Sequence, residues 1–180
     1  MSEVRRVTPQ EWATLRSIRL AALRDAPRSF GSAYEREAAW DEARWRESAR
    51  TVAWFLAWRD GLPVGVAGGH GGAVTDTGAP GEQRDGEGAS AAEAGDERRL
   101  ISMWVEPAAR GTGIADALIG TVAGWARADG ARTLKLWVAD ASPRARAFYE
   151  RAGFRPTGAT DEMPGDPGAK QQELRLDLYA

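Results

Sequence analysis

The chain has 180 residues, of which 43% are hydrophobic and 28% are charged, proportions typical of a soluble globular protein. A domain of this length buries roughly 70% of the surface that its unfolded chain exposes, so we expect one domain spanning residues 1–180. With 24 basic and 26 acidic residues, the formal net charge of −2 predicts no general attraction to nucleic acid or to an anionic membrane. The absence of cysteine excludes disulfides, thiolate zinc sites and a cysteine nucleophile.

Targeting and metal-binding signals are also missing from the sequence. The N-terminal residues lack the apolar region of a signal peptide, and no run of 18 or more apolar residues occurs, so we expect a cytoplasmic protein with no membrane partner. The single histidine, His70, stands in the glycine-rich stretch 68–72, where we expect a solvated loop. A histidine triad or a metal cluster has no residues to build it, and we expect no metal.

The first third of the chain predicts helices followed by a hairpin. Thr8-Pro9-Gln10-Glu11 has the form of a capping box and predicts a helix that begins there and is stopped by Pro27. A shorter helix is expected over 33–48. A β-rich run at 52–59, a turn at Asp60-Gly61 and a second short run then predict a β-hairpin. Residues that recur at helical spacing on one face of the first helix are Trp12, Leu15, Ile18 and Ala22.

A polar segment interrupts this pattern at about residues 70–97. It is rich in Gly, Ala, Glu and Asp, and Val74 is its only sizeable apolar residue. Such a composition cannot bury enough surface to offset the entropy of ordering the chain. We therefore expect a mobile insertion inside the domain, and the sequence leaves open whether it acts as a lid.

The remainder of the chain predicts strands that alternate with helices. A strand at 100–105 precedes a helix that Gly130 ends, a strand at 133–140 precedes a helix that Ser142-Pro143 caps, and strands at 154–157 and 172–178 close the chain. The order of the elements predicts a mixed α/β sheet with helices on both faces.

The junction between the strand at 100–105 and the next helix carries the clearest chemical signal. Gly111 and Gly113 permit a tight turn, and the first amides of the following helix have no partner within the helix, so together they form an anion cradle beside Arg110. A P-loop would need Gly-Lys-Ser/Thr, and a Rossmann fingerprint would need a small residue where Asp116 stands. An ordinary glycine-rich turn before a helix remains an alternative interpretation.

Two blocks of sequence resemble the GNAT superfamily of N-acetyltransferases. Arg110, Gly113 and Ala115 match the Arg-x-x-Gly-x-Ala motif that binds pyrophosphate in that family. The segment 142–154, SPRARAFYERAGF, is similar to its Asn-x-x-Ala-x-x-Phe-Tyr…Gly-Phe signature, with Ser142 in place of asparagine. The resemblance spans about Val4 to Leu178. It implies an α+β fold with a largely antiparallel seven-stranded sheet and helices on both faces.

The resemblance further implies a transferase that moves the acetyl group of acetyl-CoA directly to a primary amine. It implies that Tyr149 is a general acid for the leaving thiolate, and the alternative interpretation is a core residue on the apolar face of its helix. By the same resemblance, the main-chain amide of Met103 would stabilise the oxyanion. The residues implied to bind the coenzyme are Met103, Trp104, Val105, Arg110, Gly111, Thr112, Gly113, Ile114, Ala115, Ser142 and Phe148.

The acceptor is less defined by the sequence. Family analogy places it near Phe30, Glu35, Trp104 and the loop 163–170, while Glu35 and Glu97 are candidates for the general base between which we do not choose. We expect a small-molecule amine as acceptor, with a protein or peptide amine or a non-catalytic acyl-CoA-binding module as alternatives. The scattered basic residues Arg16, Arg19 and Arg24 are expected on a solvated face and predict no nucleic-acid partner. The sequence does not distinguish a monomer from a homodimer.

Overall fold

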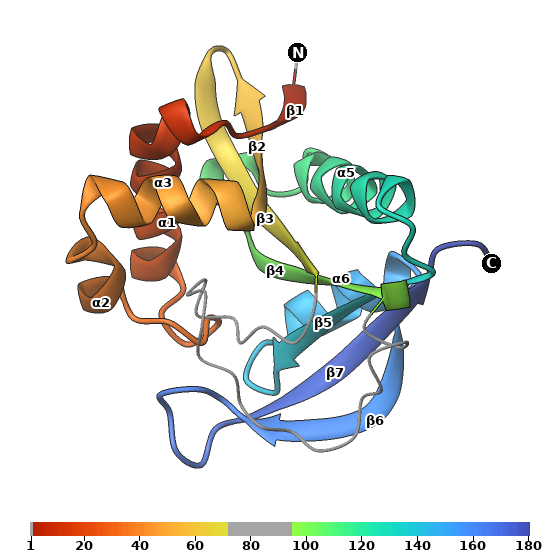
Figure 1. Cartoon of the computed structure of the whole chain (residues 1–180). Coiled ribbons are helices and arrows are strands. Elements are labelled where there is room, and N and C mark those ends of the chain that lie inside the picture. The colour runs from red at the N-terminus through yellow and green to blue at the C-terminus, as the bar shows by residue number, and fades with distance from the viewer. Residues whose placement is uncertain (1, 72–94) are drawn as a thin grey trace.

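A computed structural model describes residues 2–71 and 95–180 and shows a seven-stranded sheet flanked by helices (Figure 1). The strand order is β1-β2-β3-β4-β5-β7-β6, and every neighbouring pair is antiparallel except β4 and β5. The predicted α+β class is thus confirmed. In chain order the elements are β1 Ser2–Arg6, a 3-10 turn Pro9–Glu11, α1 Trp12–Asp25, α2 Tyr34–Ala38, α3 Glu42–Thr51, β2 Ala53–Arg59, β3 Leu62–Gly71, β4 Glu97–Val105, a 3-10 turn Pro107–Ala109, α5 Ile114–Ala128, β5 Thr133–Ala139, α6 Pro143–Arg151, β6 Arg155–Glu162 and β7 Lys170–Asp177.

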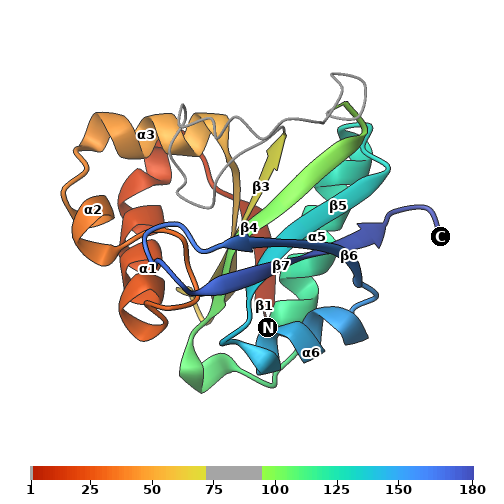
Figure 2. The ribbon, with the colours of Figure 1, turned by 90° about the horizontal axis from the view of Figure 1, so that it is seen from below.

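Two hydrophobic clusters lie on opposite faces of the sheet. α1 and α3 pack on one face through Leu15, Ile18, Trp45 and their neighbours, and α5 and α6 pack on the other face (Figure 2). The apolar residues of α5 recur at helical spacing and so lie on one face, which packs on the sheet. Leu118 and Val122 on this face are fully buried. Among the described residues no helix has the length and apolar character needed to cross a membrane.

The start of α1 is fixed by the predicted capping box. The backbone N–H of Thr8 donates to the Glu11 carboxylate at 3.0 Å, and the Arg5 guanidinium lies 2.7 Å from the same carboxylate. The hydrogen bond from Arg5, followed by that from Thr8, lowers the pKa of Glu11 to about 2. Because folding lowers the pKa of Glu11, its ionised carboxylate stabilises the folded protein above the usual carboxyl pKa. This stabilisation is lost as the pH falls toward 2.

The expected single helix over 33–48 is wrong, because the structure contains two helices there. α2 ends at Ala38 and α3 begins at Glu42, with the Asp41 side chain accepting a hydrogen bond from the backbone N–H of Arg44 at 2.9 Å. The break lets Trp40 and Trp45 pack with their ring centroids 5.0 Å apart. The helical periodicity of this segment continues across the break, so it did not indicate the second N-terminal cap at Asp41.

Arg19 is buried rather than solvated, contrary to the prediction for the basic stretch on α1. It donates two hydrogen bonds to the Glu37 carboxylate, at 2.9 and 2.8 Å, and both side chains are at most 2% exposed. Its guanidinium also lies 4.9 Å from the centre of the Phe30 ring. A bidentate pair of this kind links α1 to α2 and holds the segment between them.

The boundaries of the expected insertion also need correction. Residues 68–71 belong to β3, and Glu97 and Arg98 belong to β4, while most of the predicted insertion lies outside the described residues. Glycine is required within β3 because a Cβ on Gly69 would lie 2.4 Å from the Trp125 ring of α5. His70 is accordingly a partly buried strand residue rather than a loop residue, and burial lowers its pKa.

Gly69→Ala tests whether this close approach of helix and strand is structural. We expect the free energy of unfolding to fall by about 1 to 3 kcal/mol, the usual cost of overpacking a core. Denaturant unfolding measures it, with Gly71→Ala in the same strand as the control, since a Cβ there meets only the Arg98 side chain at 3.4 Å or more. Equal stability of the two variants would contradict the packing described here.

Candidate active site

The strands β4 and β5, at the centre of the sheet, pair over a short parallel stretch and then diverge. β4 and β5 pair only where Glu97, Arg98 and Arg99 face 133–135. Farther along β4, the register shift against β3 places Ser102 and Met103 opposite the single residue Ala67, and Ser102 adopts a φ of 56°. Such a bulge bends a strand and removes residues from its ladder. Met103 thereby leaves the β3 ladder in the part of β4 that no longer pairs with β5.

A cavity of about 820 Å³ opens at this gap on the side of α5 and α6. It is large enough for a ligand of cofactor size. Of the residues predicted to bind the coenzyme, nine line it: Met103, Trp104, Val105, Arg110, Gly111, Gly113, Ala115, Ser142 and Phe148. The predicted acid Tyr149 and the predicted acceptor residue Phe30 line it as well.

The turn before α5 has the geometry of an anion cradle. Gly111 and Gly113 have φ angles of 78° and 83°, a region that favours glycine, and a Cβ at either position would meet no other atom of the described protein within 4 Å. The first backbone hydrogen bond of α5 runs from Ala117 N–H to Gly113 O at 3.0 Å. The backbone N–H groups before Ala117 therefore have no partner within the helix. These residues fit a phosphate or pyrophosphate group.

Two predicted contacts of this turn can act only through the backbone. The hydroxyl of Thr112 donates to Ala109 O at 2.6 Å, and the side chain of Ile114 is 2% exposed within the core. Neither side chain lines a described cavity. Any part that Thr112 and Ile114 take in binding an anion therefore falls to their amides.

Arg110 is paired within the protein by a residue that the sequence did not indicate. Its Nε donates to Val105 O at 2.9 Å, and its Nη2 forms an ion pair with Asp25, the last residue of α1. Asp25 also accepts a hydrogen bond from Trp104 Nε1 at 2.8 Å. The hydrogen bond from Trp104, aided by Arg110, lowers the pKa of Asp25. The cation of the anion cradle thus has an internal counter-charge.

Ser142 occupies the predicted cap position of α6 without capping the helix. Its hydroxyl accepts no hydrogen bond from the helix backbone and instead lies 3.3 Å from the hydroxyl of Ser29, in the segment between α1 and α2. The expected side-chain cap is therefore wrong. This contact across the cavity mouth joins two segments that are far apart in the sequence, and no local pattern around Ser29 could have revealed it.

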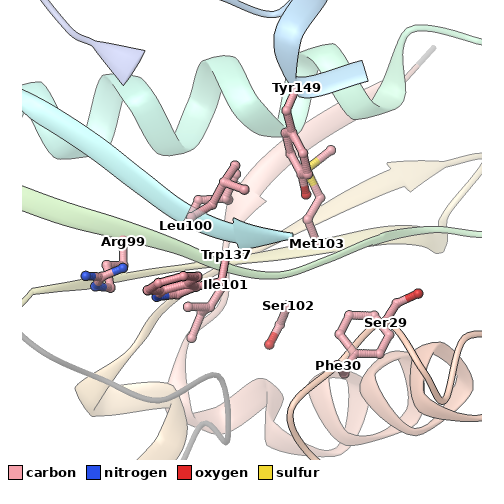
Figure 3. Close-up of a pocket in the computed structure, with 10 residues that line it drawn as sticks. Ser29, Phe30, Arg99, Leu100, Ile101, Ser102, Met103, Trp137 and Tyr149 are labelled. Carbon is pink, nitrogen blue, oxygen red and sulfur yellow. The ribbon is translucent and has the colours of Figure 1, made fainter. Parts of the chain in front are cut away.

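A second cavity, of about 50 Å³, adjoins the first along β4 and β5. Four residues line both cavities: Ser29, Phe30, Met103 and Tyr149. Figure 3 shows Tyr149 pointing from α6 toward Met103, while Ser29 and Phe30 approach from the opposite side. The Tyr149 ring also packs on Phe154, with centroids 5.7 Å apart, so its apolar face has a structural role as well. The two cavities meet at Met103 and Tyr149.

The carboxylates considered from the sequence lie away from this meeting point. Glu35 is exposed on α2 and lines neither cavity. Glu97, at the beginning of β4, forms an ion pair with Lys135 at 2.6 Å. In the described part of the chain no three His, Cys, Asp or Glu side chains gather as metal ligands would. Met163 and Lys170 of the late loop line a separate hollow of about 360 Å³ beside Arg28.

Solved structures with the same fold include several acetyltransferases. One from Streptococcus pneumoniae, of the GNAT family, has a TM-score of 0.72 at 16% identity and covers 98% of this chain and 99% of its own. One from Salmonella typhimurium, solved with its cofactor acetyl-CoA, has a TM-score of 0.69 at 15% identity, covering 100% and 95%. The ribosomal-protein-S18-alanine N-acetyltransferase of Escherichia coli has a TM-score of 0.65 at 16% identity, covering 100% and 96%.

Sequence comparison gives the family directly. No curated protein matches the chain. The model of the Acetyltransferase (GNAT) family matches residues 17–154, which includes both sequence blocks and the parting of β4 and β5. Because this match covers more than half of the chain, the protein belongs to the GNAT family of acetyltransferases.

Proposed function

We propose that the protein transfers the acetyl group of acetyl-CoA to the primary amine of a small molecule by direct attack, within a single domain. The observation that carries this proposal is the meeting of two cavities at Met103 and Tyr149. The larger cavity suits the coenzyme, and the smaller one offers the acceptor a separate approach. Family membership supports acetyl-CoA as the donor.

In this proposal the coenzyme lies along β4 and ends at the start of α5. The amides of 111–115 hold the pyrophosphate, and the backbone of Met103 to Val105 holds the pantetheine arm. The positive end of α5 adds to the attraction. Ser142 is shorter than the asparagine of the family motif, and its hydroxyl, close to Ser29, is one of the polar groups at the cavity mouth.

The chemistry requires an amine to form a C–N bond as the C–S bond of the thioester breaks, with the amine losing a proton and the thiolate gaining one. Acetyl-CoA, when bound, supplies the activated carbonyl. In this proposal the Met103 amide, which has no partner in the β3 register, stabilises negative charge on the carbonyl oxygen. In the same proposal Tyr149 protonates the leaving thiolate. The chain has no cysteine for an acyl-enzyme route.

The size of the acceptor cavity favours a small molecule. At about 50 Å³ it admits a group of a few heavy atoms between β4, β5 and Phe30. A protein or peptide amine is the second candidate, because a neighbour in fold is an N-acetyltransferase of a ribosomal protein. A non-catalytic acyl-CoA-binding module is the third, since Ser142 departs from the family motif. Release of coenzyme A with a panel of amines separates catalysis from binding alone.

Gly113→Glu tests the cradle. We expect coenzyme binding to be abolished, because a charged side chain would fill the space that the pyrophosphate needs. Gly130→Glu is the matched control: Gly130 has a φ of 82°, follows the other end of α5 and has open space around it, so the backbone strain is similar. Calorimetry with acetyl-CoA measures both folded variants. Unchanged affinity in folded Gly113→Glu would overturn the assignment of the cradle.

Substitutions at Asp25 and Arg110 should change the affinity for the coenzyme in opposite directions. Arg110→Ala should weaken binding by about 1 kcal/mol, the low end for a charged hydrogen bond, since Asp25 already offsets its charge. Asp25→Asn should tighten binding severalfold, because removing a carboxylate about 4 Å away contributes on the order of 1 kcal/mol at high dielectric. The effect of Asp25→Asn should persist in the Arg110→Ala background and shrink at high salt. Weaker binding in Asp25→Asn would show that Asp25 serves mainly to position Arg110.

Tyr149→Phe tests the general acid. We expect kcat to fall by about 10²-fold, toward the lower end for general acid catalysis, because a thiolate leaves moderately well without help. Coenzyme affinity should stay unchanged, since the ring still packs on Phe154. Tyr179→Phe, the same change at an exposed site near the C-terminus, is the control. If Tyr149→Phe keeps the full kcat, Tyr149 is a packing residue and the proton comes from another source.

A further inference from the structure

We propose that Arg144 and Arg151 of α6 bind the 3′-phosphate of coenzyme A, so that the protein selects acetyl-CoA over its 3′-dephospho form. This inference rests on the proposed placement of the coenzyme and adds a second phosphate site, separate from the cradle at 111–115. Coenzyme A carries the 3′-phosphate on its ribose as a monoester, with a charge of about −1.5 to −2 at pH 7. Arginine side chains that have no counter-charge of their own suit such a group.

The two arginines lie on the face of α6 that borders the large cavity. Arg144, Phe148 and Arg151 are spaced at i, i+4 and i+7, so they share one side of the helix, and all three line the cavity of about 820 Å³. Seven residues at about 1.5 Å each place the Cα atoms of the arginines roughly 10 Å apart along the helix axis. Two arginine side chains can bridge this distance to meet at one phosphate.

The positive charge of this face is not balanced within the described part of the chain. Neither Arg144 nor Arg151 forms an ion pair with a described residue, whereas Arg146, which does not line the cavity, pairs with Glu150 at 3.0 Å. Arg110, the other cation of the cavity, is offset by Asp25. The positive charge that remains for a ligand on the cavity wall therefore comes from α6.

Helix stability does not account for Arg144. It is the second residue of α6, and no acidic residue stands in the first turn of this helix. A cation at this position meets the positive end of the helix dipole and destabilises the helix. The charge of Arg144 therefore gains from an anion outside the helix rather than from the helix itself.

Arg151 is held in place beside Phe148. Its Nη1 donates to Ala147 O at 3.2 Å, and its guanidinium carbon lies 6.0 Å from the centre of the Phe148 ring. A guanidinium has five N–H donors, so four of them have no partner among the residues that the structure describes. Because α6 already orients the side chain, binding a phosphate there costs less side-chain entropy than at a freely rotating arginine.

The α5 side of the cavity disfavours a second phosphate. Asp116, in the first turn of α5, lines the same cavity. Its carboxylate repels a dianion on that side. A ligand that carries its pyrophosphate at 111–115 and one further phosphate therefore places the further phosphate toward α6.

Calorimetry with coenzyme A and with 3′-dephospho-coenzyme A tests the site. The unaltered protein should bind coenzyme A about tenfold more tightly at low salt, as two partly exposed contacts to a dianion provide. The ratio of the two affinities should approach one near 1 M salt, where the Debye length is about 3 Å. Equal affinities at low salt overturn the 3′-phosphate site and leave the placement of the coenzyme intact.

The double variant Arg144→Gln/Arg151→Gln removes both cations and keeps polar side chains. We expect its affinity for coenzyme A to fall about tenfold and its affinity for the dephospho form to stay unchanged, so the preference is lost. Unchanged binding of the dephospho form also shows that the variant is folded. Equal weakening of both ligands would overturn the proposal, because the arginines would then act on the pyrophosphate.

Arg146→Gln is the matched control, because it removes a cation of the same helix that is paired with Glu150 and does not line the cavity. It should keep the preference for coenzyme A. A preference that persists in the folded double variant, or that is lost equally in Arg146→Gln, overturns the proposal. If the unaltered protein binds neither ligand, the placement of the coenzyme is itself wrong, and the 3′-phosphate site falls with it.

Discussion

The parting of β4 and β5 is the constraint on which the rest of the site depends. The two strands share only three paired positions, and the bulge at Ser102 and Met103 then bends β4 away. Backbone groups that leave a ladder inside a protein need other partners. In this fold Met103 lines a cavity where it leaves the β3 ladder, so the gap in the sheet opens a hollow beside β4.

A buried ion pair closes the opposite side of that gap. Arg19 and Glu37 are almost fully buried, and the guanidinium also contacts the Phe30 ring. Breaking such a pair leaves an uncompensated charge in the core, which is strongly unfavourable. The pair therefore keeps the segment between α1 and α2, with Ser29 and Phe30, against β4 and α6. This side of the cavity is therefore held by electrostatics within the core rather than by a strand.

Charge at the two ends of the site is balanced by internal partners. Asp25 offsets Arg110 beside the anion cradle, and Glu173 offsets Arg99 beside the small cavity. Each guanidinium is thus oriented by a carboxylate within the protein. The predicted anion cradle consists chiefly of amides of the turn before α5, whose positions are set by the left-handed conformations of Gly111 and Gly113.

The sequence by itself determined those features that depend on short-range order. The capping box at Thr8, the glycine turn at 110–115 and the apolar faces of α5 and α6 are local, since helix periodicity and turn geometry involve residues a few positions apart. Only the tertiary structure decided that the glycines at 68–71 belong to a strand. Their sequence predicts a loop, and the reason for glycine at Gly69 is the ring of Trp125 packed against it. The same holds for Asp25 beside Arg110 and Glu173 beside Arg99. Their partners are 85 and 74 residues away in the chain, and only strand order and helix packing bring such charges together.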